Sequence, residues 1–296
     1  MNQIKISLFL FLISNLVIAF AGESLSTNTF KEIESKAFSL GKKYGNKNVL
    51  IVLDIDNTIL TMPQELGSDQ WFTWQYESCI KKKNLGSHCT TQNMGELLSL
   101  QGKLFSVSKM LPTEKITPVI VAKLQKLGFK IILLTSRGPT FRSATEKELS
   151  RNGYSMDPSA IGPKLGYAGT FKPYKLNNPK AFGISTSEAK IAKLGKPRSA
   201  SYMNGVMMTS GMNKGIMLKT LLHKTATKFK GIIFADDHQK HTIRMQQILG
   251  DDKGVELVTF RYGAIDPQVT AFKKSNKKDV IKAFTIFDNA LKAIFK

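Results

Sequence analysis

Short apolar runs that alternate with amphipathic segments are the feature that most restricts the fold of this chain. Residues 48–54 contain the run Val49–Leu53, which is continuously apolar, as is typical of a strand buried on both faces of a parallel sheet. Comparable strands are expected over residues 129–135, 230–235 and 255–260. Amphipathic helices are expected over residues 26–45, 117–127, 139–152, 214–225, 238–249 and 279–295. We therefore predict an α/β fold with a Rossmann-like parallel sheet flanked by helices.

Two stretches interrupt this alternation. Residues 61–114 contain four aromatic side chains close together: Trp71, Phe72, Trp74 and Tyr76. We expect them to form a small core of their own, and stacking on a substrate is the alternative. Residues 157–212 are rich in Gly, Pro, Ser and Lys, with short strand-like pieces such as 201–209. Both stretches are predicted to be insertions into one domain that spans residues 22–296, the second of them irregular and basic.

The first 21 residues resemble a secretory signal peptide. Lys5 is their only charged side chain, an apolar run covers residues 6–20, and the segment ends in the small-x-small sequence Ala19-Phe20-Ala21. Cleavage is predicted after Ala21, and an uncleaved membrane anchor is the alternative. The protein is therefore expected to be exported, either to the periplasm or out of the cell.

The formal net charge of +21 raises the question of a nucleic-acid partner. The hydrophobic fraction of 42% is too high for a disordered basic tail. The basic runs, such as Lys81–Lys83 and residues 273–278, are not accompanied by a helix-turn-helix, zinc-finger or single-strand-binding signature. Nucleic acid is therefore not a required partner, and a basic surface would instead concentrate anionic substrates.

Cys79 and Cys89 are the only cysteines of the chain. Two cysteines exclude a disulfide-scaffold protein and a four-cysteine zinc module. Because export permits disulfides, we expect these two residues to be bonded to each other. Two free thiols, or a weak metal site that includes His88, are the alternatives.

Polar residues follow three of the predicted strands at their carboxyl ends. Asp54 and Asp56 follow the first strand, Thr135 ends the second, and Asp236-Asp237 follow the third. These strand ends meet at one edge of a parallel sheet, where open α/β folds bind ligands. Burial of carboxylates is costly unless they are paired or bind a cation, which favours a functional site over a solvent-facing loop. Thr135 taken alone is equally consistent with a cap of the next helix.

Lys214 is predicted to begin a helix, where a positive charge is electrostatically unfavourable. This position indicates a role in a site, with an ordinary surface lysine as the alternative. Arg137, two residues after Thr135, is placed either to reach a second anionic group of a substrate or to form a surface ion pair. His238 and His241 have the spacing of a metal-binding pair on a helix, but we expect a solvated face.

The ordered set Asp-x-Asp-x-Thr, Thr, Lys and Asp-Asp resembles the motifs of the haloacid dehalogenase-like hydrolase superfamily. The resemblance covers residues 48–60, 115–152 and 213–262. It is greatest to the secreted bacterial acid phosphatases with the Asp-x-Asp-x-Thr motif, although the insertions match neither class of those enzymes. The superfamily inserts a cap after its first motif, so the resemblance implies that residues 61–114 form a cap-type insertion.

The resemblance also implies the roles of the strand-end residues. Asp54 would be the nucleophile that forms an aspartyl-phosphate, and Asp56 the general acid and base. Thr135 and Lys214 would bind the phosphoryl group. A Mg²⁺ cofactor would be held by Asp54, by the backbone carbonyl of Asp56, and by Asp236 and Asp237. The resemblance does not distinguish which of Asp236 and Asp237 is the direct ligand.

The expected function is therefore that of an exported, Mg²⁺-dependent phosphomonoesterase. An acid at position 56 excludes the dehalogenases and transport ATPases of the superfamily, and export favours a phosphatase over a mutase. The substrate would be a phosphorylated small molecule or a phosphoprotein. One alternative is a basic exported binding protein for anionic lipid, polysaccharide or nucleic acid, with a non-catalytic fold. The other is a phosphotransferase that uses the same aspartyl-phosphate.

Overall fold

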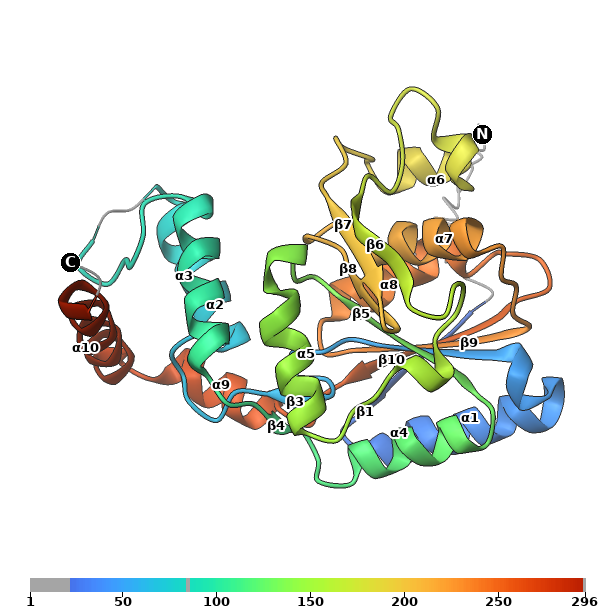
Figure 1. Ribbon diagram of the computed structural model, residues 1–296, viewed down its shortest axis with the longest axis horizontal. Coiled ribbons are helices and arrows are strands. Elements are labelled where there is room, and N and C mark those ends of the chain that lie inside the picture. Colours follow the sequence, from blue (N-terminus) through green and yellow to red (C-terminus); the bar gives the residue numbers. More distant parts are fainter. Residues whose placement is uncertain (1–21, 84–85, 295–296) are drawn as a thin grey trace, which may run out of the picture.

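Figure 1 shows the computed structural model of the protein, which describes residues 22–83 and 86–294. The predicted signal peptide, residues 1–21, lies outside these described residues. An eight-stranded sheet forms the centre of the fold. In spatial order its strands are β1 (Glu23–Thr27), β10 (Glu256–Tyr262), β9 (Gly231–Asp236), β2 (Val49–Leu53), β5 (Lys130–Thr135), β8 (Val206–Met208), β7 (Ala200–Met203) and β6 (Gly166–Phe171). The strands from β1 to β8 in this order run parallel, and β7 runs antiparallel to both of its neighbours, β8 and β6.

Helices cover both faces of this sheet (Figure 1). Alternate residues of β2 point to opposite faces, so Val49, Ile51 and Leu53 join one hydrophobic cluster while Leu50 and Val52 join the other. The first cluster packs under α1 (Phe30–Tyr44), α4 (Thr117–Lys126) and α5 (Arg142–Arg151), and the second packs mainly under α7 (Lys214–Thr225) and α8 (Gln239–Leu249). The predicted α/β architecture with a mostly parallel sheet between helices is confirmed.

The amino-terminal part of the described chain differs from the prediction. The helix expected over residues 26–45 begins only at Phe30, because the Thr29 side chain caps it by accepting a hydrogen bond from the Lys31 amide. Residues Glu23–Thr27 form β1, an edge strand paired in parallel with β10. This short, largely polar strand has no strong local pattern, and it forms because the edge of β10 is available. Asp266–Lys274 form a further helix, α9, that the periodicity did not indicate.

Residues 157–212 extend the central sheet beyond β5. They contain β6, the short helix α6 (Thr186–Ile191) and the β7–β8 hairpin. The hairpin turn places Asn204 at φ 50° and Gly205 at φ 71°, a pair of left-handed residues that this kind of tight turn requires. Because β8 pairs in parallel with β5, this segment is part of the same sheet as the predicted core strands.

Four helices form a second body beside the sheet, here called the helical module: α2 (Asp69–Gln75), α3 (Met94–Val107), α9 and α10 (Lys278–Ile294) (Figure 1). Its base is the antiparallel pair of β3 (Leu60–Thr61) and β4 (Leu111–Pro112). Trp71 is fully buried in the core of the module, together with Leu97, Leu104, Phe272 and Val280. Trp71 thus lies in a core and Phe72 and Trp74 pack against it, as predicted, whereas Tyr76 is exposed. The chain completes that core with its carboxyl-terminal helices. None of the helices in the described residues has the length and apolar character needed to cross a membrane.

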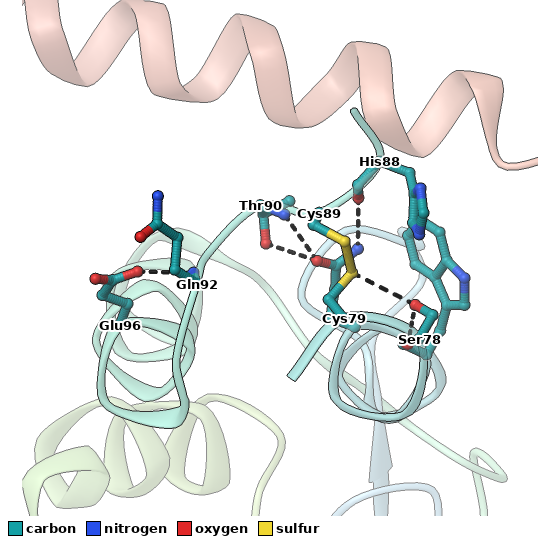
Figure 2. The surroundings of a disulfide bond; sticks show 9 residues. Ser78, Cys79, His88, Cys89, Thr90, Gln92 and Glu96 are labelled. Atoms are coloured by element: carbon teal, nitrogen blue, oxygen red, sulfur yellow. Dashed lines mark hydrogen bonds between the residues drawn. A yellow bond between two sulfur atoms is a disulfide. The ribbon is translucent and has the colours of Figure 1, made fainter. Parts of the chain in front are cut away.

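Cys79 and Cys89, in the segment between α2 and α3 of the helical module, form a disulfide (Figure 2). Beside it the Gln75 side chain accepts hydrogen bonds from Thr90 and donates one to the backbone carbonyl of His88. The His88 ring lies against Trp74, with 5.8 Å between the ring centroids. The predicted disulfide is confirmed, and the alternatives of free thiols or a metal site with His88 are wrong, because both sulfur atoms are bonded to each other.

Replacement of both cysteines by alanine should destabilise the protein by about 3 kcal/mol, since the bond closes a short loop and restricts the unfolded chain. Urea unfolding of the purified variant measures this loss. Wild-type protein treated with a reductant should unfold like the variant, and the variant itself should not respond to the reductant. An unfolding midpoint equal to that of the oxidised wild type would show that the bond has no stabilising effect.

Candidate functional site

The predicted site residues lie at the carboxyl edge of three neighbouring strands. The chain passes from β2 to β5 and β8 on one side and later returns to β9 on the other side, so β2 marks the point where the strand order reverses. Asp54 directly follows β2, and its amide continues the ladder by donating to the Ala235 carbonyl over 2.9 Å. Thr135 and Asp236 are the last residues of β5 and β9. Sheet topology therefore brings together residues that are up to 182 positions apart in the sequence.

Lys214 connects two of these acids. Its ammonium nitrogen lies 2.7 Å from Asp54 Oδ1 and 2.6 Å from Asp236 Oδ2, and its side chain is 0% exposed. The lysine is the first residue of α7, a position set by Asn213, whose side chain caps that helix. Burial disfavours the ammonium charge, but the carboxylates of Asp236 and Asp54 outweigh burial and raise the Lys214 pKa. Lys214 is therefore a fixed positive charge between two buried carboxyl groups.

The two acids bound to Lys214 have opposite protonation behaviour. Burial raises the pKa of Asp54 to about 7, with further contributions from Asp236 and Asp56, and Lys214 only partly offsets them. Burial acts in the same direction on Asp236, but Lys214 and His241 hold the pKa of that carboxyl well below its usual range. Asp236 is consequently a permanent carboxylate, whereas Asp54 changes protonation near neutral pH.

His241 completes the surroundings of Asp236. Its Nδ1 lies 2.9 Å and 3.0 Å from the two carboxylate oxygens of Asp236. Burial and the charge of Lys214 lower the His241 pKa to about 4, so the ring is neutral at pH 7 and donates the Nδ1 hydrogen. The expectation of a solvated histidine face is wrong for this residue, because α8 packs His241 directly against the end of β9.

Asp56 is paired with Arg137 rather than with Lys214. The guanidinium donates from Nε and from a terminal nitrogen to the two Asp56 oxygens, over 2.9 Å and 2.7 Å. Arg137 also donates its backbone amide to Thr135 Oγ1 over 3.1 Å. The turn after Asp56 depends on Asn57, whose φ of 55° lies in the left-handed region that asparagine tolerates. A surface ion pair for Arg137 is therefore wrong, since its side chain is only 4% exposed.

Asp237 is held near the other acids but is differently bonded. Its backbone amide donates to Thr58 Oγ1 over 3.1 Å, which ties it to the turn after β2. Among the described residues, its carboxylate oxygen Oδ1 is buried without a hydrogen-bond partner. Burial raises the pKa of this carboxyl well above its usual range, and nearby carboxylates, including those of Asp69 and Asp54, add to that increase. A buried acceptor of this kind indicates a place for a cation or a proton donor.

The helical module reaches the site through Asp69, the first residue of α2. Its carboxylate lies 3.1 Å from His238 Nε2. Burial opposes the positive charge of His238, but Asp69 and Asp237 outweigh it and raise the His238 pKa to about 9. The histidine face predicted as solvated is thus occupied by a contact between the module and the sheet. Sequence reasoning missed Asp69, which carries no local signal, and it placed both histidines after Asp236-Asp237 in solvent, whereas His241 is buried and His238 contacts Asp69.

Two groups of side chains at this edge have the composition and spacing to hold a metal ion: Asp54, Asp236 and His241, and Asp69, Asp237 and His238. Within the first group, the Lys214 ammonium already binds both carboxylates. Asp237, in the second group, retains the unpartnered oxygen. The arrangement therefore combines buried negative charge, one fixed ammonium group and a threonine hydroxyl on an adjacent strand.

Comparison with known protein families identifies the family of this chain. A search of the curated proteins and a search of the solved structures returned no match for the chain. The sequence model of the family described as "Protein of unknown function (DUF2608)" matches residues 26–294. This range includes every residue of the site and, apart from the edge strand β1, all the strands of the central sheet. The protein therefore belongs to the DUF2608 family.

Proposed function

We propose that this protein is an exported, Mg²⁺-dependent phosphomonoesterase with a haloacid dehalogenase-like core. The observation that carries the proposal is the Lys214 ammonium bound between Asp54 and Asp236 at the carboxyl edge of the sheet. Buried carboxylates and a buried lysine are costly to maintain and have a direct use in phosphoryl transfer, which depends on positioning and on neutralisation of charge.

The proposed reaction has two steps. The Asp54 carboxylate attacks phosphorus, the bond from phosphorus to the leaving oxygen breaks, and that oxygen takes a proton from Asp56. Asp56 then removes a proton from a water molecule, and the resulting hydroxide attacks the aspartyl-phosphate. The bond between phosphorus and the Asp54 oxygen breaks, which releases inorganic phosphate and regenerates the carboxylate.

Two further side chains suit a phosphoryl group. Thr135 Oγ1 accepts a hydrogen bond from the Arg137 amide, and no described acceptor takes its hydroxyl hydrogen. That hydrogen is therefore available for a phosphoryl oxygen. Lys214, bound to Asp54, would offset the negative charge that gathers when a phosphate dianion approaches a carboxylate.

The donor set fits a magnesium ion. Carboxylate and carbonyl oxygens are the ligands that Mg²⁺ takes in proteins. We assign them to Asp54, the backbone carbonyl of Asp56 and Asp237, because the Asp237 oxygen lacks another described partner whereas Asp236 is bonded to Lys214 and His241. When bound, the ion would neutralise charge on the transferring phosphoryl group.

The helical module is proposed to act as the cap. Asp69 contacts His238, and Gln70 accepts a hydrogen bond from Asn57 over 3.4 Å, so the start of α2 lies against the loops that carry the site acids. Of the proposed catalytic side chains, Asp56 is the more open, with 20% of its side chain exposed. Substrate would therefore reach Asp54 from the side of Asp56 and the module.

Steady-state hydrolysis of nitrophenyl phosphate tests this function. The purified protein should release nitrophenol and inorganic phosphate in equal amounts when Mg²⁺ is present. An excess of chelator should stop turnover, because the carboxylates would lose the ion that balances their charge, and added Mg²⁺ should restore it. Turnover that is unchanged in chelator would contradict the metal assignment. No turnover, together with salt-sensitive binding to anionic vesicles or polysaccharide, would support the binding-protein alternative.

A further inference from the structure

The guanidinium group of Arg137 is held on every side by described residues. Two of its nitrogens donate to the carboxylate of Asp56. The remaining terminal nitrogen donates to Thr145 Oγ1 over 2.8 Å, and Thr145 itself is buried and donates to the Phe141 carbonyl. The plane of the group lies over the ring of Phe105, with 3.8 Å from the guanidinium carbon to the ring centroid.

This set of contacts leaves Arg137 little capacity to bind a substrate. The side chain is 4% exposed, and the edge of the guanidinium that matches a carboxylate or a phosphate in a bidentate manner is already taken by Asp56. Its position is also independent of Asp56, since Thr145 and Phe105 hold it from other directions. Arg137 is thus a rigid support with a single charged partner.

We infer that Arg137 is a positioning residue, which fixes the carboxyl group of Asp56 so that it can exchange a proton with the leaving oxygen and with water. The inference rests on the proposed function, because it concerns the acid and base of that reaction. Asp56 lies in a loop, and a loop side chain without a support would sample several rotamers. A bidentate pair fixes both oxygens of the carboxylate at once, which is the preorganisation that proton transfer needs.

The same contacts connect Asp56 to the helical module. Phe105 belongs to α3, and Met110, whose sulfur lies 3.3 Å from a terminal nitrogen of Arg137, follows that helix. The position of α3 therefore sets the position of the guanidinium, which in turn sets that of the acid. In this way a movement of the module would be transmitted to Asp56 and not to Asp54, whose charged partner is Lys214.

Two substrates with different leaving groups separate positioning of the acid from other roles. An alkyl phosphate such as glycerol phosphate needs a proton on its leaving oxygen. In dinitrophenyl phosphate the leaving group is dinitrophenolate, a weak base that departs readily without a proton. The ratio kcat/KM covers only the first phosphoryl transfer, because transfer to Asp54 commits the substrate. Arg137→Met should lower kcat/KM for the alkyl phosphate by roughly 100-fold, within the range that general acid catalysis contributes. It should change kcat/KM for the dinitrophenyl ester little.

Matched variants keep the experiment decisive. Arg137→Lys retains the charge but cannot bind both oxygens, so it should recover only part of the loss on the alkyl phosphate. It also serves if Arg137→Met does not fold. Arg142→Met removes a partly buried arginine of the same region that bonds to Ser201 and Glu146, and it should leave the ratio between the two substrates unchanged. In an Asp56→Asn background, Arg137→Met should cause no further loss.

The outcomes distinguish this inference from the proposed function. Wild-type protein that hydrolyses neither ester would refute the phosphatase, and the inference with it. Active wild type with an equal loss on both esters in Arg137→Met would overturn the inference alone, and would point to phosphate binding or to a structural role. A further loss in the Asp56→Asn background would overturn it as well, because Arg137 would then act through another group.

Discussion

Replacement of Asp54 by asparagine should reduce kcat by roughly 10⁴- to 10⁶-fold, the range lost when an enzyme loses its nucleophile. An amide of nearly the same shape has no charged oxygen with which to attack phosphorus, so no aspartyl-phosphate can form. The substitution should spare the fold. Burial raises the Asp54 pKa to about 7, so a neutral side chain suits this position, and Lys214 keeps its pair with Asp236.

Initial rates on nitrophenyl phosphate, together with a thermal unfolding curve, measure both effects. Asp252→Asn is the matched control. Asp252 follows the end of α8, forms an ion pair with Lys219 and has no part in the proposed reaction. That variant should keep wild-type turnover. An Asp54→Asn protein that still turns over at the wild-type rate would exclude Asp54 as the nucleophile and, with it, the proposed mechanism.

Replacement of Lys214 by methionine should destabilise the protein by about 3–5 kcal/mol at neutral pH, the loss typical when one partner of a buried ion pair is removed. Methionine fills nearly the same space, but it leaves Asp54 and Asp236 close together without the ammonium group between them. Hydrolysis should be lost too, because the carboxylate that attacks a phosphate dianion would have no positive charge beside it from the protein.

The stability loss in Lys214→Met should depend on pH in a defined direction. In the wild type, Lys214 holds the folded-state pKa of Asp236 below the unfolded value of 3.8, so the stability contributed by this ionised carboxyl is constant above that value and is lost only as pH falls through the folded-state pKa. In the variant, the buried carboxyl groups take up protons at higher pH, which relieves their repulsion. The difference in unfolding free energy between wild type and variant should therefore shrink as pH is lowered from 7 towards 4.

Urea unfolding at several pH values measures this difference. The control is Lys126→Met, which removes an exposed lysine from the last turn of α4 and should change the unfolding free energy little. Added Mg²⁺ should stabilise Lys214→Met if the freed carboxylates bind it. Equal unfolding free energies for wild type and Lys214→Met at neutral pH would show that Lys214 is not the counter-charge of the buried acids.

Several elements of the fold follow from local sequence patterns. The run Val49–Leu53 becomes β2, with every residue buried, and the helix predicted over 214–225 has those bounds in the structure. A strand that is buried on both faces has a continuous apolar run, and a helix that is buried on one face has apolar residues at helical spacing, so both elements can be identified from the sequence. Strand β1 leaves no such trace, since its five residues are largely polar and its place depends on the exposed edge of β10.

Some features of the site were likewise predictable from the sequence, and others were not. Asp54, Thr135 and Asp236 were predicted together because each comes at the end of a strand of one parallel sheet. Their partners were not predictable. Arg137 pairs with Asp56 over 81 positions of sequence, and Asp69 meets His238 over 169 positions. Such pairings depend on how helices and loops pack in three dimensions, and no local spacing records them.

By itself, the sequence determined the parallel sheet, its helical covering and the acidic, hydroxyl and ammonium groups along one of its edges, because strand burial and strand polarity are local properties. The tertiary structure alone decided how those groups are charged and supported. Lys214 becomes a bridge between two acids because the start of α7 lies against the ends of β2 and β9. His241 and Lys214 both bind Asp236, whereas Asp237 has a carboxylate oxygen without a partner among the described residues. Electrostatic energies depend on distance and burial, and packing sets both.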